Sequence, residues 1–210
     1  MRIITGKYKG RHFDIPRSFK ARPTTDFAKE NIFNVLTAYI DFEEGISGQG
    51  CEALDLFAGT GSITLELLSR GCAHVVSVEL DRDHHRFISS CILKLGWREE
   101  GGRWKENTPA SDSTTDGILP PPSTLLLPRN DVFRFIKSCK QQFDFIFADP
   151  PYALKELPQI PDLVLNPQTS NLLKPGGIFV FEHGKDHDFS HHPRFVEHRA
   201  YGSVNFSLFR

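Results

Sequence analysis

The run Asp149-Pro150-Pro151-Tyr152 directly follows an apolar stretch, residues 143–148, and contains residue types that could activate an exocyclic amine. Such an amine is a weak nucleophile because its lone pair is delocalised into the base. Hydrogen bonds from it to the Asp149 carboxylate and the Pro150 carbonyl would aim the lone pair at a methyl donor, and Asp149 would stabilise the charge that develops on nitrogen. The prolines fix the backbone, and Tyr152 can stack on the base. The alternative is a rigid turn after a strand.

A glycine turn, residues 57–61, lies between a short apolar run that ends in Asp55 and a segment with helical spacing, residues 62–70. Glycines let a backbone approach a ligand closely, and ligands of α/β sheets bind where strands end. The pattern fits NAD, FAD or S-adenosylmethionine. Thr64 stands where a third glycine would complete the dinucleotide pattern, and Asp55 would repel a pyrophosphate but suits an ammonium group. These details favour S-adenosylmethionine, with contacts at Asp55, Phe57, Ala58, Gly59, Thr60 and Gly61. A tight turn without a ligand is the alternative.

Further polar residues follow the neighbouring strands. Glu79 ends the run 74–79 and lies twenty residues past Gly59, a spacing at which a carboxylate meets the ribose hydroxyls. Asp131 follows the run 125–127 and could either cap a helix or accept a hydrogen bond from adenine. Leu80 and Val132, beside these acids, complete this part of the expected cofactor site. Near the start of the chain, Arg22, Thr24 and Thr25 either cap a helix or line the mouth of that site.

Composition limits the remaining possibilities. The chain has 210 residues and a formal net charge of −1, which suits one α/β domain and excludes a polycation. The first 22 residues are nevertheless basic, so Arg2, Lys7, Lys9 and Arg11 could contact an RNA backbone, or the segment could be a solvated hairpin. Four widely spaced cysteines without a Cys-x-x-Cys pattern indicate reduced thiols in a cytoplasmic protein. No signal peptide, membrane span or metal site is predicted, and His183, His187, His191 and His192 are assigned to a surface loop.

The order of elements predicts the fold. Strands alternate with helices and end in a hairpin, residues 195–209, which indicates an α/β protein with a doubly wound, mostly parallel, seven-stranded sheet and an antiparallel C-terminal hairpin strand. A small basic β-hairpin, with strands at residues 1–5 and 11–15, is expected to form an extension over residues 1–21. The main domain then spans residues 22–210. Within it, residues 97–123 have the composition of a loop insertion, and Trp104 either anchors that loop or contacts a partner.

These motifs together resemble those of the class I, Rossmann-like S-adenosylmethionine-dependent methyltransferases that act on amino groups. More narrowly, the chain resembles the bacterial 16S rRNA guanine-N2 methyltransferases, the RsmD family, over almost its whole length. The glycine turn and Asp149 motif are shared with many methyltransferases. Residues 2–6 and the run Arg22-Pro23-Thr24-Thr25-Asp26 are more specific to the family. The resemblance implies cofactor contacts at Asp55, the glycine turn, Glu79 and Asp131, and catalysis at the Asp149 motif. Residues 97–123 are longer than is usual in the family.

The resemblance also implies a substrate, 16S rRNA within a small subunit or an assembly intermediate, and we expect a monomer. Two other functions remain open. A DNA adenine-N6 or cytosine-N4 methyltransferase would use the same amine chemistry but would need a larger recognition domain. A non-catalytic RNA-binding assembly factor would bind the cofactor without methylating RNA.

Overall fold

The fold is described from a computed structural model, in which residues 1–19, 25–107, 123–168 and 170–210 are described. The elements in chain order are α1 (Asp26–Leu36), β1 (Glu52–Leu56), α2 (Ser62–Ser69), β2 (His74–Val78), α3 (Arg82–Lys94), β3 (Arg98–Glu100), β4 (Arg103–Lys105), β5 (Thr124–Leu126), α4 (Val132–Ser138), β6 (Phe143–Ala148), the 3-10 helix η1 (Leu157–Gln159), α5 (Ile160–Leu165), β7 (Leu173–His183), β8 (Phe195–Tyr201) and β9 (Val204–Phe209).

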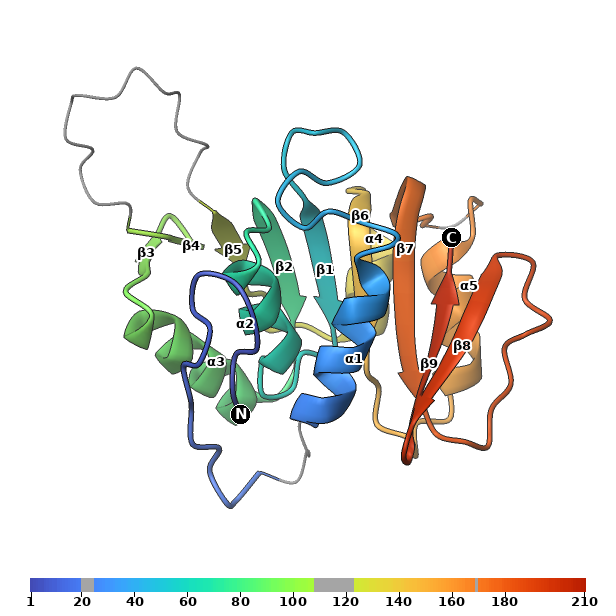
Figure 1. Ribbon diagram of the computed structural model, residues 1–210, viewed down its shortest axis with the longest axis horizontal. Coiled ribbons are helices and arrows are strands. Elements are labelled where there is room, and N and C mark those ends of the chain that lie inside the picture. Colours follow the sequence, from blue (N-terminus) through green and yellow to red (C-terminus); the bar gives the residue numbers. More distant parts are fainter. Residues whose placement is uncertain (20–24, 108–122, 169) are drawn as a thin grey trace.

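All the described strands lie in one sheet, in the order β3-β4-β5-β2-β1-β6-β7-β9-β8 (Figure 1). The five central strands, from β5 to β7, are parallel, and both edges are antiparallel. The chain runs outward from β1 to β2 and β5, then returns to β6 on the other side of β1. The strand order therefore reverses between β1 and β6, where open α/β sheets bind their ligands.

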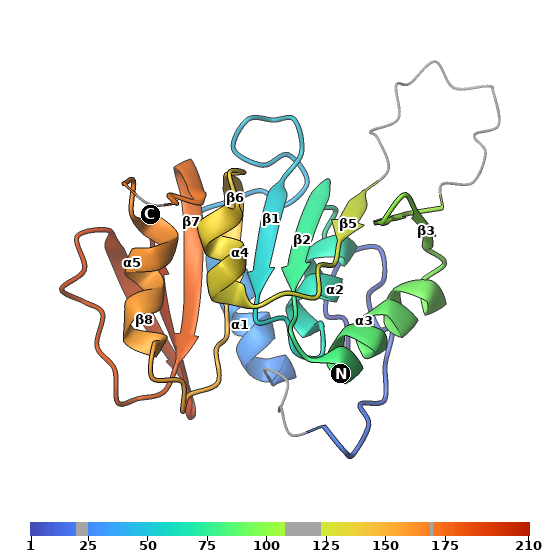
Figure 2. The same cartoon turned by 180° about the vertical axis from the view of Figure 1, so that it is seen from behind.

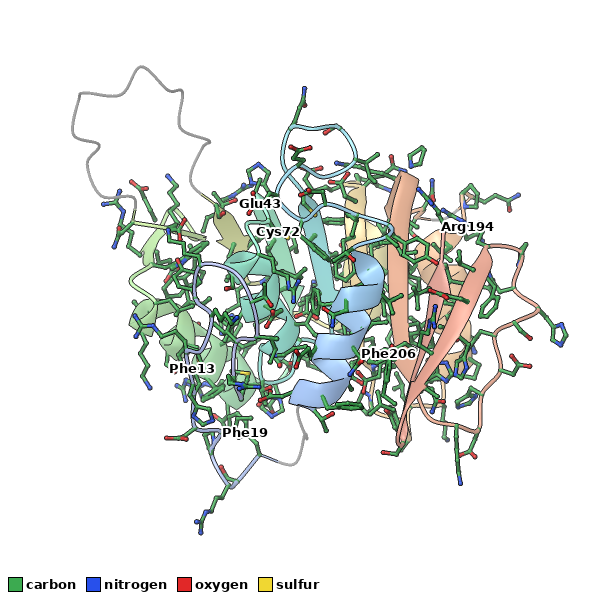
Figure 3. The ribbon with its side chains drawn as sticks, viewed as in Figure 1. Phe13, Phe19, Glu43, Cys72, Arg194 and Phe206 are labelled. Atoms are coloured by element: carbon green, nitrogen blue, oxygen red, sulfur yellow. The ribbon has the colours of Figure 1, made fainter. Side chains whose placement is uncertain are left out.

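Helices cover both faces of the sheet. Helices α1, α2 and α3 lie on one face (Figure 1), and α4 and α5 lie on the other (Figure 2). Strand β6 is buried along its whole length, because alternate side chains enter the two cores: Phe145 and Phe147 on one side, Ile146 and Ala148 on the other. Phe206 of β9 is also fully buried (Figure 3) and extends the first core to the antiparallel edge. Burial on both faces explains why the central strands are nearly continuous apolar runs.

The seven predicted strands are present, but the prediction missed β3 and β4, which lie in the segment assigned to a loop. Gly101 and Gly102 both have positive φ, 60° and 77°, and join the two strands in a tight hairpin. Trp104 pairs with Leu125 of β5 and is buried, so it anchors the hairpin to the body. The prediction failed because three-residue strands rich in charge carry almost no periodic signal.

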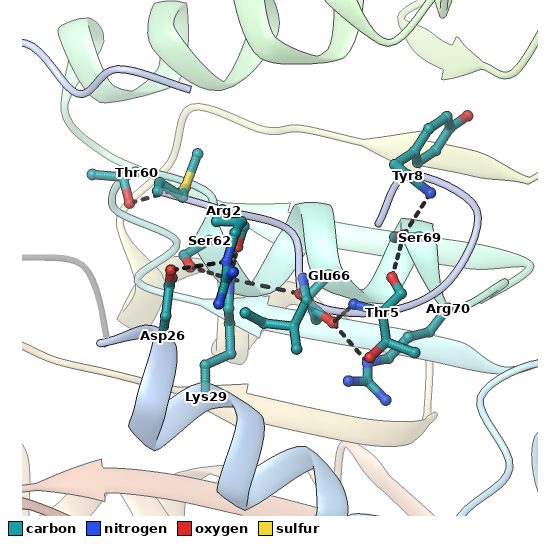
Figure 4. Close-up of polar contacts among 12 residues, drawn as sticks. Arg2, Thr5, Tyr8, Asp26, Lys29, Thr60, Ser62, Glu66, Ser69 and Arg70 are labelled. Carbon is teal, nitrogen blue, oxygen red and sulfur yellow. Dashed lines mark hydrogen bonds and ion pairs between the residues drawn. The ribbon is translucent and has the colours of Figure 1, made fainter. Parts of the chain in front are cut away.

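The N-terminal segment differs from the predicted hairpin. Its two arms pair through one antiparallel bridge, Arg2 with His12, and hydrogen bonds from Ile3 N to Arg11 O (3.0 Å) and from Phe13 N to Met1 O (2.9 Å), but they do not extend into regular strands. The segment instead packs on α2, because the buried Glu66 carboxylate accepts hydrogen bonds from the backbone N–H groups of Ile4 (2.8 Å) and Thr5 (3.1 Å) (Figure 4). Arg70 Nε also donates to Glu66, at 3.0 Å. The backbone groups that would extend a ladder are thus bonded to a helix side chain.

Helix α5 has only six residues, because Asn166 precedes Pro167 and adopts an extended conformation (ψ 115°) that ends the helix. His183 does not lie in a surface loop but is the buried last residue of β7, where its Nε2 hydrogen-bonds with Ser207 Oγ at 2.9 Å. Across the described ranges, none of the helices has the length and apolar character of a membrane span.

Candidate active site

An open cavity of about 910 Å³ lies where the parallel strands end. Six acids of the described residues line it. Four of them lie in, or directly after, four adjacent strands, in spatial order: Glu79 after β2, Asp55 in β1, Asp149 after β6 and Glu182 in β7. The structure therefore brings together most of the predicted site. The predicted residues that line the cavity are Thr25, Asp55, Phe57, Ala58, Gly59, Thr60, Glu79, Leu80, Asp131, Val132, Asp149, Pro150, Pro151 and Tyr152.

The glycine turn connects β1 to α2 through three residues with positive φ, Phe57 (61°), Gly59 (55°) and Gly61 (76°). A Cβ on Gly59 would meet nothing closer than a backbone oxygen at 3.8 Å, and Gly59 lines the cavity. A Cβ on Gly61 would lie 2.8 Å from Ile88 of α3, and Gly61 is not part of the cavity wall. The first glycine keeps the backbone open to a ligand, whereas the second allows two helices to pack.

Asp55 is almost fully buried under the glycine turn. Its Oδ2 accepts a hydrogen bond from Thr64 Oγ1 at 2.6 Å, and Thr64 Oγ1 also hydrogen-bonds with Ser77 Oγ at 2.6 Å. Burial raises the pKa of the Asp55 carboxyl to about 7, although the Thr64 hydrogen bonds oppose the shift. A cation in the cavity would favour the ionised form. Thr64, which departs from the dinucleotide glycine pattern, thus serves to hold this carboxylate.

Glu79 is held by two backbone N–H groups. Gly59 N donates to its Oε2 at 2.6 Å, and Asp81 N donates to its Oε1 at 2.7 Å. These bonds orient the carboxylate at the cavity wall and tie the end of β2 to the glycine turn. A carboxylate fixed in this way suits a ligand with neighbouring hydroxyl groups, as the sequence predicts.

Asp131 and Thr25 both cap helices at the cavity. Asp131 Oδ1 accepts from Arg134 N at 2.9 Å, and Thr25 Oγ1 accepts from Ala28 N at 3.2 Å. Each residue therefore caps a helix, as one of the two predicted alternatives states. Both also line the cavity, so each could contact a ligand as well. The predicted residues Arg22 and Thr24 lie outside the described residues.

The Asp149 motif leaves β6 at the middle of this edge. Burial, and then the carboxylates of Glu182 and Asp55, raise the pKa of Asp149 well above its ordinary value. Tyr152 has 46% of its surface exposed, and its hydroxyl donates to Glu182 Oε1 at 3.3 Å. Burial, and then the carboxylates of Glu182 and Asp149, raise the pKa of the Tyr152 hydroxyl, so it stays protonated. The motif thus presents acceptors and an accessible aromatic ring to one cavity.

Sequence reasoning missed Glu182 as a site residue. The signal was present, because the apolar run 178–181 is followed directly by an acid, as the run before Glu79 is. Ser203, in the β8–β9 turn, and Val204, the first residue of β9, also line the cavity and carried no such signal. They reach it only because β9 pairs with β7.

The basic residues predicted to bind RNA lie apart from the cavity. Lys7 N bonds to Ser69 O at the C-terminal end of α2, whereas the cavity lies at the N-terminal end of that helix, about 12 Å away for eight residues. Lys7, Lys9 and Arg11 are exposed, and Lys7 Nζ pairs with Glu106 at 2.7 Å. Arg2 is closer to the cavity: its carbonyl accepts from Lys29 Nζ (2.6 Å), which also donates to Ser62 in the cavity wall (Figure 4).

Comparison with known proteins places this architecture in a family. The family model described as "Conserved hypothetical protein 95" matches residues 1–115 and 123–210. The chain is 28% identical to the uncharacterized methylase RP545 of Rickettsia prowazekii, over 100% of this chain and 97% of that protein. It is 29% identical to ribosomal RNA small subunit methyltransferase D of Haemophilus influenzae, over 89% and 80%.

Among solved structures, a hypothetical protein of Thermus thermophilus matches with a TM-score of 0.73 and 25% identity, covering 100% of this chain and 99% of that one. The family match extends through both chemical motifs and the N-terminal segment. The chain therefore belongs to the conserved hypothetical protein 95 family, the RsmD-family methyltransferases that its motifs resemble.

Proposed function

We propose that the protein transfers a methyl group from S-adenosylmethionine to the exocyclic N2 amine of a guanine in small-subunit ribosomal RNA. One observation carries the proposal: the glycine turn and the Asp149 motif leave adjacent parallel strands, with Leu56 opposite Ala148, and line one cavity. The relative in Haemophilus influenzae named ribosomal RNA small subunit methyltransferase D supports the class of substrate.

The cavity fits the cofactor. Its volume of about 910 Å³ lies within the usual range of small-molecule sites. Gly59 offers a backbone without a Cβ, the Glu79 carboxylate suits the ribose hydroxyls, and Asp55 suits the ammonium of the methionine part. Asp131, Leu80 and Val132 would surround the adenine. When bound, S-adenosylmethionine supplies an electrophilic methyl group on a positively charged sulfur.

The residues of the Asp149 motif position the acceptor. The Asp149 carboxylate and the Pro150 carbonyl would accept the two N–H groups of the guanine amine and so orient its lone pair. The Tyr152 ring is exposed enough to stack on a base that has left the RNA stack. The positive charge of a bound cofactor would favour the ionised form of Asp149, which would then stabilise the charge that develops on nitrogen as the N–C bond forms and the S–C bond breaks. The cofactor would leave as a neutral thioether, and the methylated amine would release one proton. Alignment and electrostatics thus account for the chemistry without a covalent enzyme intermediate.

The context of the reaction follows from the substrate. Ribosomal RNA is packed with protein, so we propose that the acceptor is a small subunit or an assembly intermediate, modified in the cytoplasm by a monomer. The basic N-terminal segment, residues 1–19, would form part of the RNA contact, with Arg2 nearest the cavity and Lys7, Lys9 and Arg11 farther along.

The test is transfer of labelled methyl from S-adenosylmethionine to small subunits, naked 16S rRNA and DNA, each taken from cells that lack this gene. Nucleoside analysis should find label in N2-methylguanosine from RNA alone, and the better acceptor identifies the assembly state. An Asp162→Asn variant, which changes an exposed carboxylate on α5 outside both the cavity and the N-terminal segment, is the matched control and should remain active. Label in DNA, or cofactor binding without transfer to any RNA, would overturn the proposal.

A further inference from the structure

Glu182 lies beside Asp149 because of strand pairing. Ala148, the last residue of β6, pairs with Phe181 of β7, and each of the two is followed in the chain by an acid, Asp149 or Glu182, at the same edge of the sheet. Glu182 is 4% exposed, lines the cavity and accepts a hydrogen bond from Tyr152 Oη. It therefore reaches the region where the Asp149 motif would hold an acceptor base.

Asp55, Asp149 and Glu182 place three carboxylates in one cavity, and those of Glu182 and Asp55 both disfavour ionisation of Asp149. The positive charge of the cofactor and the N–H groups of the substrate base would both reduce the electrostatic repulsion among these three carboxylates. A second carboxylate next to the amine-binding group suits a base that presents two neighbouring donors. It disfavours a base in which every ring nitrogen beside the amine is an acceptor, because lone pairs would then face each other.

Guanine alone among the amine-bearing bases meets this requirement. Its exocyclic N2 amine is adjacent to the ring N1–H, so both groups are donors. The amine of adenine is flanked by ring nitrogens N1 and, farther away, N7, and the amine of cytosine by N3, all of which are acceptors. Enzymes that act on a flipped base read this edge by hydrogen bonding.

We propose that the Glu182 carboxylate accepts a hydrogen bond from the ring N1–H of the acceptor guanine and so selects guanine over adenine and cytosine. The inference rests on the proposed function, because it concerns the acceptor base of the same reaction. In this arrangement Asp149 and Pro150 hold the reacting amine, and Glu182 reads the atom next to it.

A different role for Glu182 would be to hold Tyr152 in place. Tyr152→Phe separates the two roles, because it removes the hydroxyl that bonds to Glu182 while leaving the carboxylate and the ring. Loss of Tyr152 positioning should lower transfer to every acceptor by the same factor. Loss of the contact to the base should change the ratio of the transfer rates to two acceptor bases that differ at N1.

The experiment uses small subunits reconstituted with 16S rRNA that carries either guanine or 2-aminopurine at the position that the wild-type protein methylates. 2-Aminopurine keeps the N2 amine but has an unprotonated N1. The wild-type protein should methylate 2-aminopurine at least about tenfold more slowly than guanine, measured as kcat/KM, because a carboxylate would face the N1 lone pair.

Glu182→Gln can turn its amide N–H toward N1, so its preference for guanine should shrink by about tenfold or more, while Tyr152→Phe keeps the wild-type ratio. Because each preference is a ratio within one protein, lowered stability cancels. If Glu182→Gln turns over too slowly, the same ratio is taken from its affinities for the two RNAs.

Equal wild-type rates on both acceptors, or an unchanged preference in Glu182→Gln, would overturn the assignment of Glu182. Absence of any methylation of guanine in RNA by the wild-type protein would instead overturn the proposed function. The two failures are therefore distinct.

Discussion

The two halves of the carboxyl edge hold their acids in different ways. In the β1–β2 half, Glu79 accepts two backbone N–H groups and Asp55 accepts a threonine hydroxyl. In the β6–β7 half, Asp149 and Glu182 lie next to each other, and their proximity disfavours the ionised form of Asp149. In the first half, hydrogen bonds from the protein already orient both carboxylates. In the second half, a ligand that brings hydrogen-bond donors would do most to favour the ionised form of Asp149.

This difference matches the proposal that the β1–β2 half binds the cofactor and the β6–β7 half carries the reaction. A cofactor site benefits from carboxylates that are already oriented, because less conformational entropy is lost on binding. A reaction site benefits from carboxylates that interact more strongly with the transition state than with the bound substrate, because positive charge develops on the amine during transfer. The predictions below, from the largest expected effect to the smallest, test this contrast between the halves.

The largest effect is expected in the β6–β7 half. Asp149→Ala should lower kcat for methyl transfer by about 10²–10³-fold, because the amine loses its orienting acceptor and the developing charge loses its counter-charge. Calorimetric titration should still find cofactor binding close to that of the wild type, since Asp55 and Glu79 remain. Near-normal turnover of this variant would remove Asp149 from the catalytic machinery.

A pH effect on stability is expected from Asp55. Its folded-state pKa, about 7, exceeds the ordinary value of 3.8, so between these values the folded protein binds more protons than the unfolded chain. The stabilisation is complete below about pH 4 and is lost as pH rises through about 7. The Asp55 contribution to the free energy of unfolding should thus fall by up to about 3 kcal/mol from pH 5 to pH 8.

Urea unfolding at both pH values checks this expectation, with Asp55→Asn as the comparison. The variant should lose less stability than the wild type over the same pH range, because its amide does not titrate. Bound S-adenosylmethionine should also flatten the wild-type profile, since a cation beside Asp55 favours the carboxylate. Parallel profiles for the two proteins would argue against a protonated Asp55.

A smaller effect is expected for the other acid of the cofactor half. Glu79→Ala should weaken cofactor binding by about tenfold to a hundredfold, through loss of hydrogen bonds to a charged group, with kcat at saturating cofactor changed by only a few fold. Glu79→Gln keeps an acceptor for Gly59 N and serves as the control for the shape of the turn. An unchanged cofactor dissociation constant in Glu79→Ala would place the ribose elsewhere.

The smallest effect is expected in the N-terminal segment, away from the carboxyl edge of the sheet. Lys9→Glu with Arg11→Glu should weaken RNA binding only several-fold at moderate salt and lower the salt slope by at most about two. These exposed residues lie near the far end of α2, and Lys7 is left unchanged because it pairs with Glu106. Lys137→Glu, an exposed change on α4 across the sheet, is the matched control. Identical salt slopes would leave the N-terminal segment with a purely structural role.

Most of the chemistry could be predicted because it is encoded locally. Asp55, Glu79 and Asp149 each follow an apolar run, and a strand followed by a turn is recognisable from a few consecutive residues. The prediction was weaker where local preference is small: β3 and β4 are short and charged, and the N-terminal strands were replaced by bonds to Glu66. In both places the decisive partners, Leu125 and Glu66, are distant in the sequence.

By itself, the sequence determined the α/β class, the glycine turn and the identity of the reactive motif, because periodicity and turn chemistry act over short stretches. Only the tertiary structure decided that Glu182 adjoins Asp149 and that Gly59 faces the cavity while Gly61 faces Ile88. It also decided that Lys7 of the basic N-terminal segment packs at the C-terminal end of α2. These relations depend on strand order and on packing between segments distant in the chain, and no local pattern specifies them.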